Sequence, residues 1–150
     1  DYIIVMGYDE HWGGGPKSGS VSSIGFFEKG LYDTLELAPA EKVIMGLPFY
    51  TRLWEEVDDK IVSYRAYGMD RARQILQENA IEPIWDEETG QFYAEYQIGD
   101  STFKIWLEDS SSIEERMKVI KDANIAGFAA WKLGLESKAV WNVIDSYNKK

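Results

Sequence analysis

Three short, continuous apolar runs limit the folds that this chain can adopt. They occupy residues 2–6, 42–47 and 125–131. Strands that are apolar along their whole length are typical of parallel sheets, in which both faces are covered. We therefore predict three parallel strands, buried on both faces, that contain residues 3–6, 43–47 and 127–130.

Apolar residues at helical spacing lie between and after these runs. They predict helices over residues 26–37 and 69–79, a third helix that begins at Ser112, and a fourth over residues 139–147. Pro39 is expected to end the first helix. Ser112 is expected to cap the third, with Glu115 three residues later completing a capping box.

Residues 52–108 interrupt this alternation of strands and helices. Apolar residues alternate over 92–98 and again over 103–107, with Gly99 and Asp100 between them, which predicts an antiparallel hairpin. A further strand near residues 84–85 is expected to pair with it. Without this insert the order is strand, helix, strand, helix, strand, helix, which is typical of barrels and doubly wound sheets. Three strands are too few to close a barrel, so we expect the chain to be part of a larger domain.

The composition excludes several classes of function. The 150 residues carry 16 basic and 26 acidic side chains, a net charge of −10, so the chain repels phosphate backbones and we expect no nucleic-acid partner. No apolar run reaches the roughly 18 residues of a membrane span, and none is expected. The chain has no cysteine, and His11 is its single histidine, which excludes thiol catalysis, a histidine-based triad and a multi-histidine metal site. No cofactor is expected.

The residues that follow each predicted strand form a candidate site, because ligands of α/β folds meet the carboxyl ends of parallel strands. Aromatic rings there suit the apolar face of a sugar, and the polar groups suit its hydroxyls. Alternatively, the aromatic side chains simply fill a large core. The residues are Tyr8, Asp9, Glu10, His11 and Trp12 after the first strand, Phe49, Tyr50, Arg52 and Trp54 after the second, and Trp131 and Lys132 after the third.

Four segments, in this order along the chain, resemble motifs of glycoside hydrolase family 18. MGYD at residues 6–9 is similar to the family's M-x-Y-D motif, and GLPFYTRLW at residues 46–54 is similar to its seventh-strand motif. WLEDSSS at residues 106–112 resembles the end of its insertion domain, and GFAAWKLGLE at residues 127–136 resembles its eighth strand. The segment YDEHWGGGP at residues 8–16 looks most like that of the family's bacterial cell-wall and spore-associated members.

The resemblance implies an α/β fold, namely the C-terminal portion (strands six to eight) of a TIM (β/α)₈ barrel with an α+β insertion domain. Residues 1–51 would hold strands six and seven with helix six. Residues 52–109 would form the insertion. Residues 110–150 would supply helix seven, strand eight and helix eight.

The resemblance also implies a reaction and roles for single residues. Family 18 enzymes hydrolyse β-1,4 bonds in N-acetylglucosamine polymers such as chitin or peptidoglycan, with retention, and the substrate's own acetamido group is the nucleophile. Tyr8 and Asp9 would orient that group, and Trp131 would form the floor beneath the sugar. Met6 would pack beneath the site. The residues expected to bind substrate are Met6, Trp12, Tyr50, Arg52 and Trp131.

The chain departs from the family in one respect that bears on catalysis. Its general acid, the Glu of D-x-x-D-x-D-x-E on strand four, has no match in residues 1–150. The acidic residues at 58–59 and 86–88 do not have the spacing of that motif and are interpreted as solvated turns. Trp85 and Trp106 are interpreted as core residues. Arg116 stands where the family often has Lys. The isolated chain is therefore expected to be inactive and able to self-associate.

Two other hypotheses remain open: a lectin-like, carbohydrate-binding protein that has lost the acid, and a structural half barrel without a ligand. By resemblance, the intact protein is expected to be secreted, or associated with the cell envelope or the spore.

Overall fold

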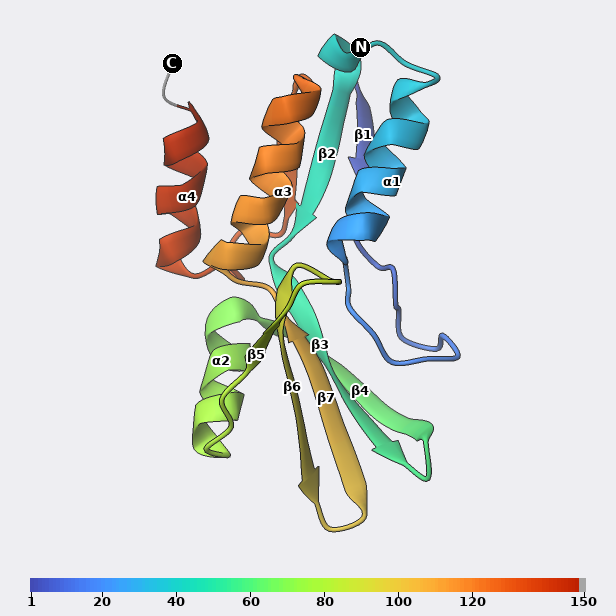
Figure 1. The fold of residues 1–150 in the computed structure, drawn as a ribbon, viewed down its shortest axis with the longest axis vertical. Coiled ribbons are helices and arrows are strands. Elements are labelled where there is room, and N and C mark those ends of the chain that lie inside the picture. Colours follow the sequence, from blue (N-terminus) through green and yellow to red (C-terminus); the bar gives the residue numbers. More distant parts are fainter. Residues whose placement is uncertain (149–150) are drawn as a thin grey trace.

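The computed structural model describes residues 1–148, which form two sheets with four helices around them (Figure 1). In chain order the elements are β1 (Ile3–Met6), α1 (Ile24–Leu35), a 3₁₀ turn (Ala40–Lys42), β2 (Val43–Pro48), β3 (Tyr50–Val57), β4 (Lys60–Gly68), α2 (Met69–Glu78), β5 (Ile84–Asp86), β6 (Gln91–Ile98), β7 (Ser101–Leu107), α3 (Ser110–Ala123), β8 (Gly127–Trp131) and α4 (Lys138–Asn148).

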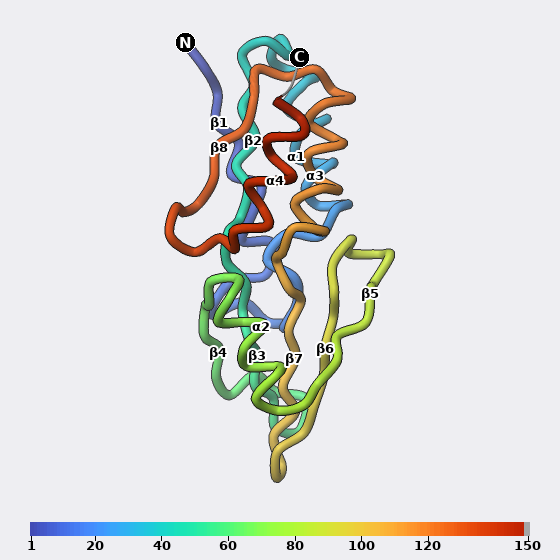
Figure 2. The backbone as a smooth tube through the Cα atoms, turned by 90° about the vertical axis from the view of Figure 1, so that its left-hand side faces the viewer, coloured from blue at the N-terminus to red at the C-terminus, as the bar shows by residue number. Residues whose placement is uncertain are grey.

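The first sheet is parallel and has the order β1-β2-β8, which confirms the three predicted strands. Ile3 pairs with Val43, and Ile44 pairs with Gly127, so segments far apart in the sequence lie side by side. The helices α1, α3 and α4 all lie on the same side of this sheet (Figure 2). The carboxyl end of β2 leads directly into β3 of the second sheet, so the strand ends on which a site can be built point toward that sheet.

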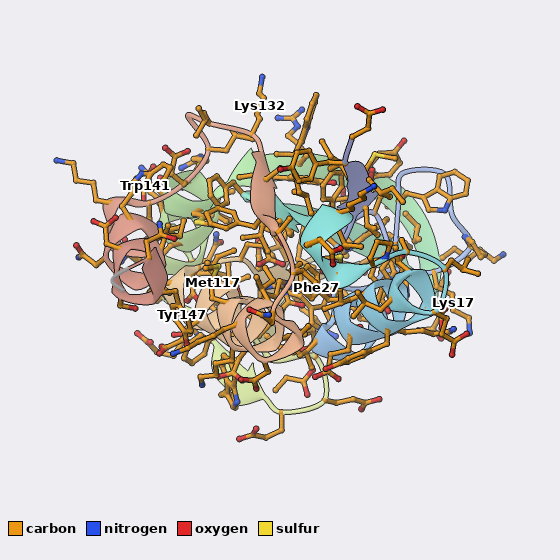
Figure 3. The ribbon with its side chains drawn as sticks, turned by 90° about the horizontal axis from the view of Figure 1, so that it is seen from above. Lys17, Phe27, Met117, Lys132, Trp141 and Tyr147 are labelled. Atoms are coloured by element: carbon orange, nitrogen blue, oxygen red, sulfur yellow. The ribbon has the colours of Figure 1, made fainter. Side chains whose placement is uncertain are left out.

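The main core lies between the parallel sheet and its helices. Phe27 of α1 and Met117 of α3 point into this layer (Figure 3), where they meet Met45 and Leu47 of β2. Each fully buried side chain of this kind contributes about 1.5–3 kcal/mol through the area it removes from water. This core fixes β2 and thereby the residues that follow it.

The expectation that all three parallel strands are buried on both faces is wrong for β1 and β8. Ile3 and Ile4 are 48% and 60% exposed, and Trp131 is 57% exposed. The helices cover only one face of the sheet, and β1 and β8 form its two edges. Only the central strand β2 is buried along almost its whole length.

The second sheet is antiparallel, with the order β4-β3-β7-β6-β5, and α2 packs on it. The predicted hairpin is confirmed, because Ile98 of β6 pairs with Ser101 of β7 across the Gly99–Asp100 turn. The short strand β5 pairs with β6, also as predicted. A small second core joins α2 to this sheet and contains Ala72, Leu76, Ala94, Ile105 and Leu107.

The β3–β4 hairpin was not among the predicted elements. In β4, Val62, Tyr64 and Ala66 alternate with polar residues, but the strand is largely exposed, so this alternation does not mark a side that faces the core. Asp58 and Asp59 both have positive φ, 50° and 59°, as the two-residue turns of twisted hairpins require. Both are exposed, in agreement with their interpretation as a solvated turn.

The helices α1 and α3 each begin two residues before the predicted positions, at Ile24 and Ser110. Ser112 does not cap α3; Asp109 does, and its carboxylate accepts hydrogen bonds from the main-chain N–H groups of Ser111 and Ser112. The Ser112 hydroxyl accepts from the N–H of Asp109, so Ser112 takes the second place of the capping box. A carboxylate is favoured over a hydroxyl at this end because of the helix dipole. At α1, Ser23 is the cap, and the helix ends at Leu35, before Pro39.

A buried ion pair links the end of β7 to α3 and to the segment before α1. Arg116 of α3 is 1% exposed and donates two hydrogen bonds, of 2.8 and 2.9 Å, to the two carboxylate oxygens of Glu108. Arg116 also donates to the main-chain oxygen and the hydroxyl of Ser22, just before α1. Glu108 accepts further hydrogen bonds from Ser112 and from Gln91 of β6. Burial raises the pKa of Glu108 to about 7, and the Arg116 charge opposes that rise.

No helix within residues 1–148 is long and apolar enough to cross a membrane.

Candidate functional site

The site begins where β1 ends, beside β2. The main-chain N–H of Gly7 donates to the carbonyl oxygen of Gly46 at 3.1 Å, so the chain still runs along β2 at this point. A Cβ on Gly7 would lie 2.7 Å from that oxygen and from the Phe27 ring, so the close approach requires glycine. Asp9 then adopts a left-handed conformation, with φ of 64°. Asp is one of the few residues that tolerate this region, which occurs often at functional sites.

The carboxylate of Asp9 is held by two side chains from β3. The Tyr50 hydroxyl donates to Oδ1 of Asp9 at 2.5 Å, and Nη1 of Arg52 donates to the same oxygen at 2.9 Å. Arg52 also donates to the main-chain oxygen of His11 at 2.9 Å, which fixes the loop beyond Asp9. The second carboxylate oxygen, Oδ2, has no protein partner within residues 1–148. It is free to bind a ligand.

The protonation state of Tyr50 suits this arrangement. Burial raises the pKa of Tyr50 far above its ordinary value, and the hydrogen bond to Asp9 raises it further. Tyr50 is therefore a phenol donor near neutral pH. Tyr8 lies edge-on to Tyr50, with ring centroids 6.2 Å apart, and its pKa is raised by partial burial and by the charge of Asp9. Two phenols and one guanidinium thus surround one carboxylate.

A hollow of about 300 Å³ opens beside this carboxylate. We call it the Asp9 hollow. It brings together residues from β1, β3, β4 and the segment after β8. Its lining residues are Asp9, Tyr50, Arg52, Ala66, Tyr67, Gly68, Trp131 and Leu135.

The structure thus brings together most of the residues that the sequence nominates. Asp9, Tyr50, Arg52 and Trp131 line the Asp9 hollow, and Tyr8 contacts Tyr50 at its edge. The peptide bond that joins Trp131 to Lys132 is cis. The side of the hollow formed by Ala66, Tyr67, Gly68 and Leu135 was not predicted, because β4 was not among the predicted strands and Leu135 lies in a loop.

Two predicted residues lie elsewhere. Met6 is 68% exposed on the edge strand β1 and does not line the Asp9 hollow, so its packing beneath the site stays a prediction. Trp12 lines a separate hollow of about 220 Å³, with Glu10, His11 and Lys17 nearby. A role of either residue in binding substrate stays a prediction.

The tryptophans of β3 and the insert behave as core residues to different degrees. Trp54 is fully buried, and its indole N–H donates to the carbonyl oxygen of Gly19 at 2.9 Å. Trp85 packs edge-on against Phe92. Trp106 is only half-buried and lies 4.7 Å from the ring of Tyr93.

Within residues 1–148 no group of three or more His, Asp or Glu side chains is placed to hold a metal ion. The groups that line the site are a carboxylate, a guanidinium, phenols and an indole ring. An anchored carboxylate with one free oxygen can accept a hydrogen bond from an amide N–H. Trp131, exposed beside it, can contact the apolar face of a sugar ring. These features, on an α/β fold, are typical of proteins that bind carbohydrates.

The chain belongs to the glycosyl hydrolases family 18, whose sequence model matches residues 1–136. Among curated relatives it is 28% identical over 148 residues to an uncharacterized glycosylase, YvbX, of Bacillus subtilis, covering 96% of this chain and 41% of the relative. It is 29% identical over 158 residues to the cortical fragment-lytic enzyme of the same organism, covering 99% and 35%.

Solved structures agree with this assignment. The spore cortex-lytic enzyme SleL of Bacillus megaterium superposes with a TM-score of 0.85 and 27% identity, over 99% of this chain and 34% of that enzyme. The chain thus spans between about a third and two fifths of the length of the relatives that it matches.

Proposed function

We propose that this chain is strands six to eight, with the insertion, of a family 18 (β/α)₈ barrel that hydrolyses β-1,4 bonds in a polymer containing N-acetylglucosamine. Residues 1–51 and 110–150 belong to the barrel in this proposal, and residues 52–109 to the insertion. The observation that carries the proposal is the anchored carboxylate of Asp9 beside Trp131 in one hollow.

The role of Asp9 follows from which of its two carboxylate oxygens already accepts hydrogen bonds. Oδ1 of Asp9 is held by Tyr50 and Arg52, so its free Oδ2 can accept the acetamido N–H of the sugar. That hydrogen bond turns the acetamido oxygen toward the anomeric carbon, where it forms a bond while the glycosidic C–O bond breaks. The departing oxygen takes a proton from a general acid. Water then opens the cyclic intermediate, with retention of configuration.

The acid must come from outside residues 1–150, since they contain no match to D-x-x-D-x-D-x-E. General acid catalysis contributes roughly 10²–10⁴-fold to a rate. The isolated chain is therefore catalytically silent in this proposal. The test is to incubate residues 1–150 with a 4-nitrophenyl glycoside of an N-acetylglucosamine oligomer. We expect no nitrophenol above a no-protein control, and release that survives repurification would refute the silence.

A second test uses a longer protein that carries this chain together with the missing acid. Asp9→Asn should lower kcat more than it raises KM, because the acetamido group needs Asp9 most when it becomes the nucleophile. Asp33→Asn on the surface of α1 is the matched control and should change neither constant. Unchanged turnover of Asp9→Asn on an oligomer of N-acetylglucosamine would remove Asp9 from the mechanism.

The alternative is a lectin-like protein that binds the same polymer without cleaving it. The Asp9 hollow favours binding in either case, since its residues need no acid to contact a sugar. A longer protein with an intact fold that binds the oligomer and never cleaves it would establish the alternative. Two relatives, a cortical fragment-lytic enzyme and a spore cortex-lytic enzyme, support peptidoglycan of the spore or cell envelope as substrate and place of action.

A further inference from the structure

A second hollow, of about 360 Å³, lies between the loop after β1 and the antiparallel sheet. We call it the Trp106 hollow. It is lined by Glu10, His11, Ser18, Gly25, Glu88 and Trp106, among others, and it shares no lining residue with the Asp9 hollow. Figure 1 shows the loop, the lower end of α1 and the β5–β6 turn meeting in this region. The function proposed above makes no use of it.

One wall of the Trp106 hollow is aromatic and rigid. Trp106 belongs to β7, which pairs with β3 on one side and β6 on the other, so its backbone is fixed. Its ring packs at 4.7 Å from that of Tyr93, whose hydroxyl donates to Glu95. The side chain is nevertheless only half-buried, so indole surface faces the hollow. A fixed, partly exposed indole is a platform for the apolar face of a ring.

The other walls are fixed by hydrogen bonds from four parts of the chain. Both carboxylate oxygens of Glu10 are occupied, by the N–H and the hydroxyl of Ser23. Ser18 donates to Glu56 of β3 at 2.5 Å. The N–H of Ile24 donates to the carbonyl oxygen of Thr89 at 2.8 Å, which ties α1 to the β5–β6 turn. The hollow therefore exists before a ligand arrives, and binding needs little ordering of the protein.

Three polar groups of the lining have unused capacity within residues 1–148. The N–H of Gly25, in the first turn of α1, and the carboxylate of Glu88 have no hydrogen-bond partner. Nδ1 of His11 lies 2.9 Å from the carbonyl oxygen of Ser20, so Nδ1 carries the proton and Nε2 is an acceptor in the neutral ring. One donor and two acceptors around an aromatic wall match the hydroxyls and the acetamido group of a sugar.

The charges of the lining select against anions. Glu10 and Glu88 are both acidic, and no Lys or Arg lines this hollow. A phosphate or an acidic glycan would meet repulsion, whereas a neutral saccharide would not. The volume falls in the range of about 300–1,000 Å³ that is typical of small-molecule sites. Glu10 and His11 also line the smaller hollow of Trp12, so the two hollows are neighbours on the same loop.

We propose that the Trp106 hollow is a second saccharide site, outside the reaction site, which takes neutral N-acetylglucosamine units of the polymer. The proposal rests on the proposed function for the identity of the sugar. It assigns Trp106 as the stacking platform, Gly25 N–H and Glu88 as hydrogen-bonding partners, and Trp12 as an extension of the site. A polymer held there stays on the protein while the Asp9 hollow engages another part of it.

The experiment follows indole N–H signals of the six tryptophans by NMR while the ¹⁵N-labelled chain is titrated with N,N′,N″-triacetylchitotriose. We expect the Trp106 and Trp131 signals to shift with separate affinities. Gly25→Leu is the blocking variant, since Gly25 lines the hollow and a Cβ there meets no atom within 4 Å, which leaves room for a side chain to compete with the ligand. Leucine also favours the helix over glycine, so α1 remains folded. This variant should weaken the Trp106 response at least tenfold and leave that of Trp131 unchanged.

Two controls make the result specific. Gly30→Ala removes the other glycine of α1 outside the hollow and should change neither response. Trp131→Ala should abolish binding in the Asp9 hollow and leave the Trp106 response intact.

Each outcome decides a separate point. A response of Trp131 without Trp106 overturns the second site and leaves the proposed function standing. A response of Trp106 without Trp131 supports the second site and counts against the Asp9 hollow. A Trp106 response that survives Gly25→Leu overturns the saccharide site, as does the absence of any response at millimolar trisaccharide. So does an equal response to trilysine or to inorganic phosphate, which serve as a cationic and an anionic control.

Discussion

The main-chain N–H of Met69 donates a hydrogen bond to the carbonyl oxygen of Leu135 at 2.8 Å, and this bond joins the start of α2 to the segment after β8. The insert and the loop that follows Trp131 therefore meet at one wall of the Asp9 hollow. Gly68 makes the contact possible, because a Cβ there would lie 2.9 Å from that carbonyl oxygen and 3.2 Å from the Leu135 Cα.

Gly68→Ala should therefore push the Leu135 segment outward. We expect a loss of about 1–3 kcal/mol in the free energy of unfolding, as for other overpacked sites, and weaker binding of triacetylchitotriose. Urea unfolding and the NMR titration measure the two effects. Gly30→Ala is the matched control: its Cβ would meet only Val5 Cγ1 at 4.0 Å, so the substitution should stabilise by roughly 0.5–1 kcal/mol and leave binding unchanged. Equal behaviour of the two variants would show that the Gly68 contact is not tight.

Tyr50→Phe removes one of the two donors that hold Oδ1 of Asp9. The carboxylate then keeps only Arg52 and turns more freely in its half-exposed position. We expect affinity for triacetylchitotriose to fall roughly 3- to 10-fold, because the variant loosens the positioning of Asp9 and removes no hydrogen bond to the ligand itself. Tyr2→Phe, at an exposed tyrosine outside the hollow, is the control. Unchanged affinity of Tyr50→Phe would mean that Arg52 alone positions Asp9.

The Arg116–Glu108 pair predicts a large, partner-dependent loss of stability. Arg116→Met leaves the carboxylate of Glu108 buried without its counter-charge, which costs about 3–5 kcal/mol. Replacing Glu108 by Gln in the same chain removes that charge and should recover part of the loss. A urea-unfolding double-mutant cycle measures this. Additive effects of Arg116→Met and Glu108→Gln would contradict a direct pair.

The sequence predicts the parallel half of the fold better than the insert, and the reason is burial. Continuous apolar runs predict β1, β2 and β8, because strands that pack against the core need apolar side chains. β4 contains β-favouring residues such as Val62 and Tyr64, but it is largely exposed, so it lacks the continuous apolar run that a core strand shows. The exposure of β1 could not be read from its sequence either, since an apolar run does not tell which strand forms the edge of a sheet.

For the site, motif resemblance named the individual residues but not their connections. The hydrogen bond from Tyr50 to Asp9 spans 41 positions and depends on the left-handed turn at Asp9. Tyr67 and Leu135 reach the hollow through β4 and a loop, and no periodic pattern marks either. The Trp106 hollow was missed because an alternating strand predicts a core tryptophan and not which part of its ring stays exposed.

Glu56 predicts a pH dependence of stability. Burial raises the pKa of Glu56, but hydrogen bonds from Lys104 and Ser18 lower it by more, so its pKa lies below the ordinary value of 4.5. A carboxyl group with a lowered pKa stabilises the fold above 4.5 and loses that contribution as the pH falls through its folded-state pKa. Glu56→Gln should therefore destabilise at pH 7 and have a smaller effect near pH 3. Urea unfolding at both pH values, with Glu82→Gln as an exposed control, checks this. A constant difference would contradict the ionic role.

The exposed face of β1 predicts that the isolated chain self-associates. Tyr2, Ile3, Ile4 and Met6 are 48–68% exposed along an edge strand, which is a surface that proteins usually cover. Light scattering at rising concentration should show a mass above 17.2 kDa. Ile4→Lys should restore the monomer by placing a charge on the edge, whereas Val62→Lys on β4 should not. A strictly monomeric mass at high concentration would rule out association without affecting the proposed reaction.

The hydrogen bonds between Arg116 and Ser22 join positions that are 94 residues apart. Closing so long a loop costs entropy that only the completed contact repays, so such contacts form late during folding. The whole antiparallel sheet lies within that loop and can form from local hairpins first. Refolding should therefore proceed in two stages, with rapid protection of amide protons in β6 and β7 from exchange and slower protection of β1 and the loop that follows it. Substitutions at Arg116 would then accelerate unfolding far more than they slow refolding.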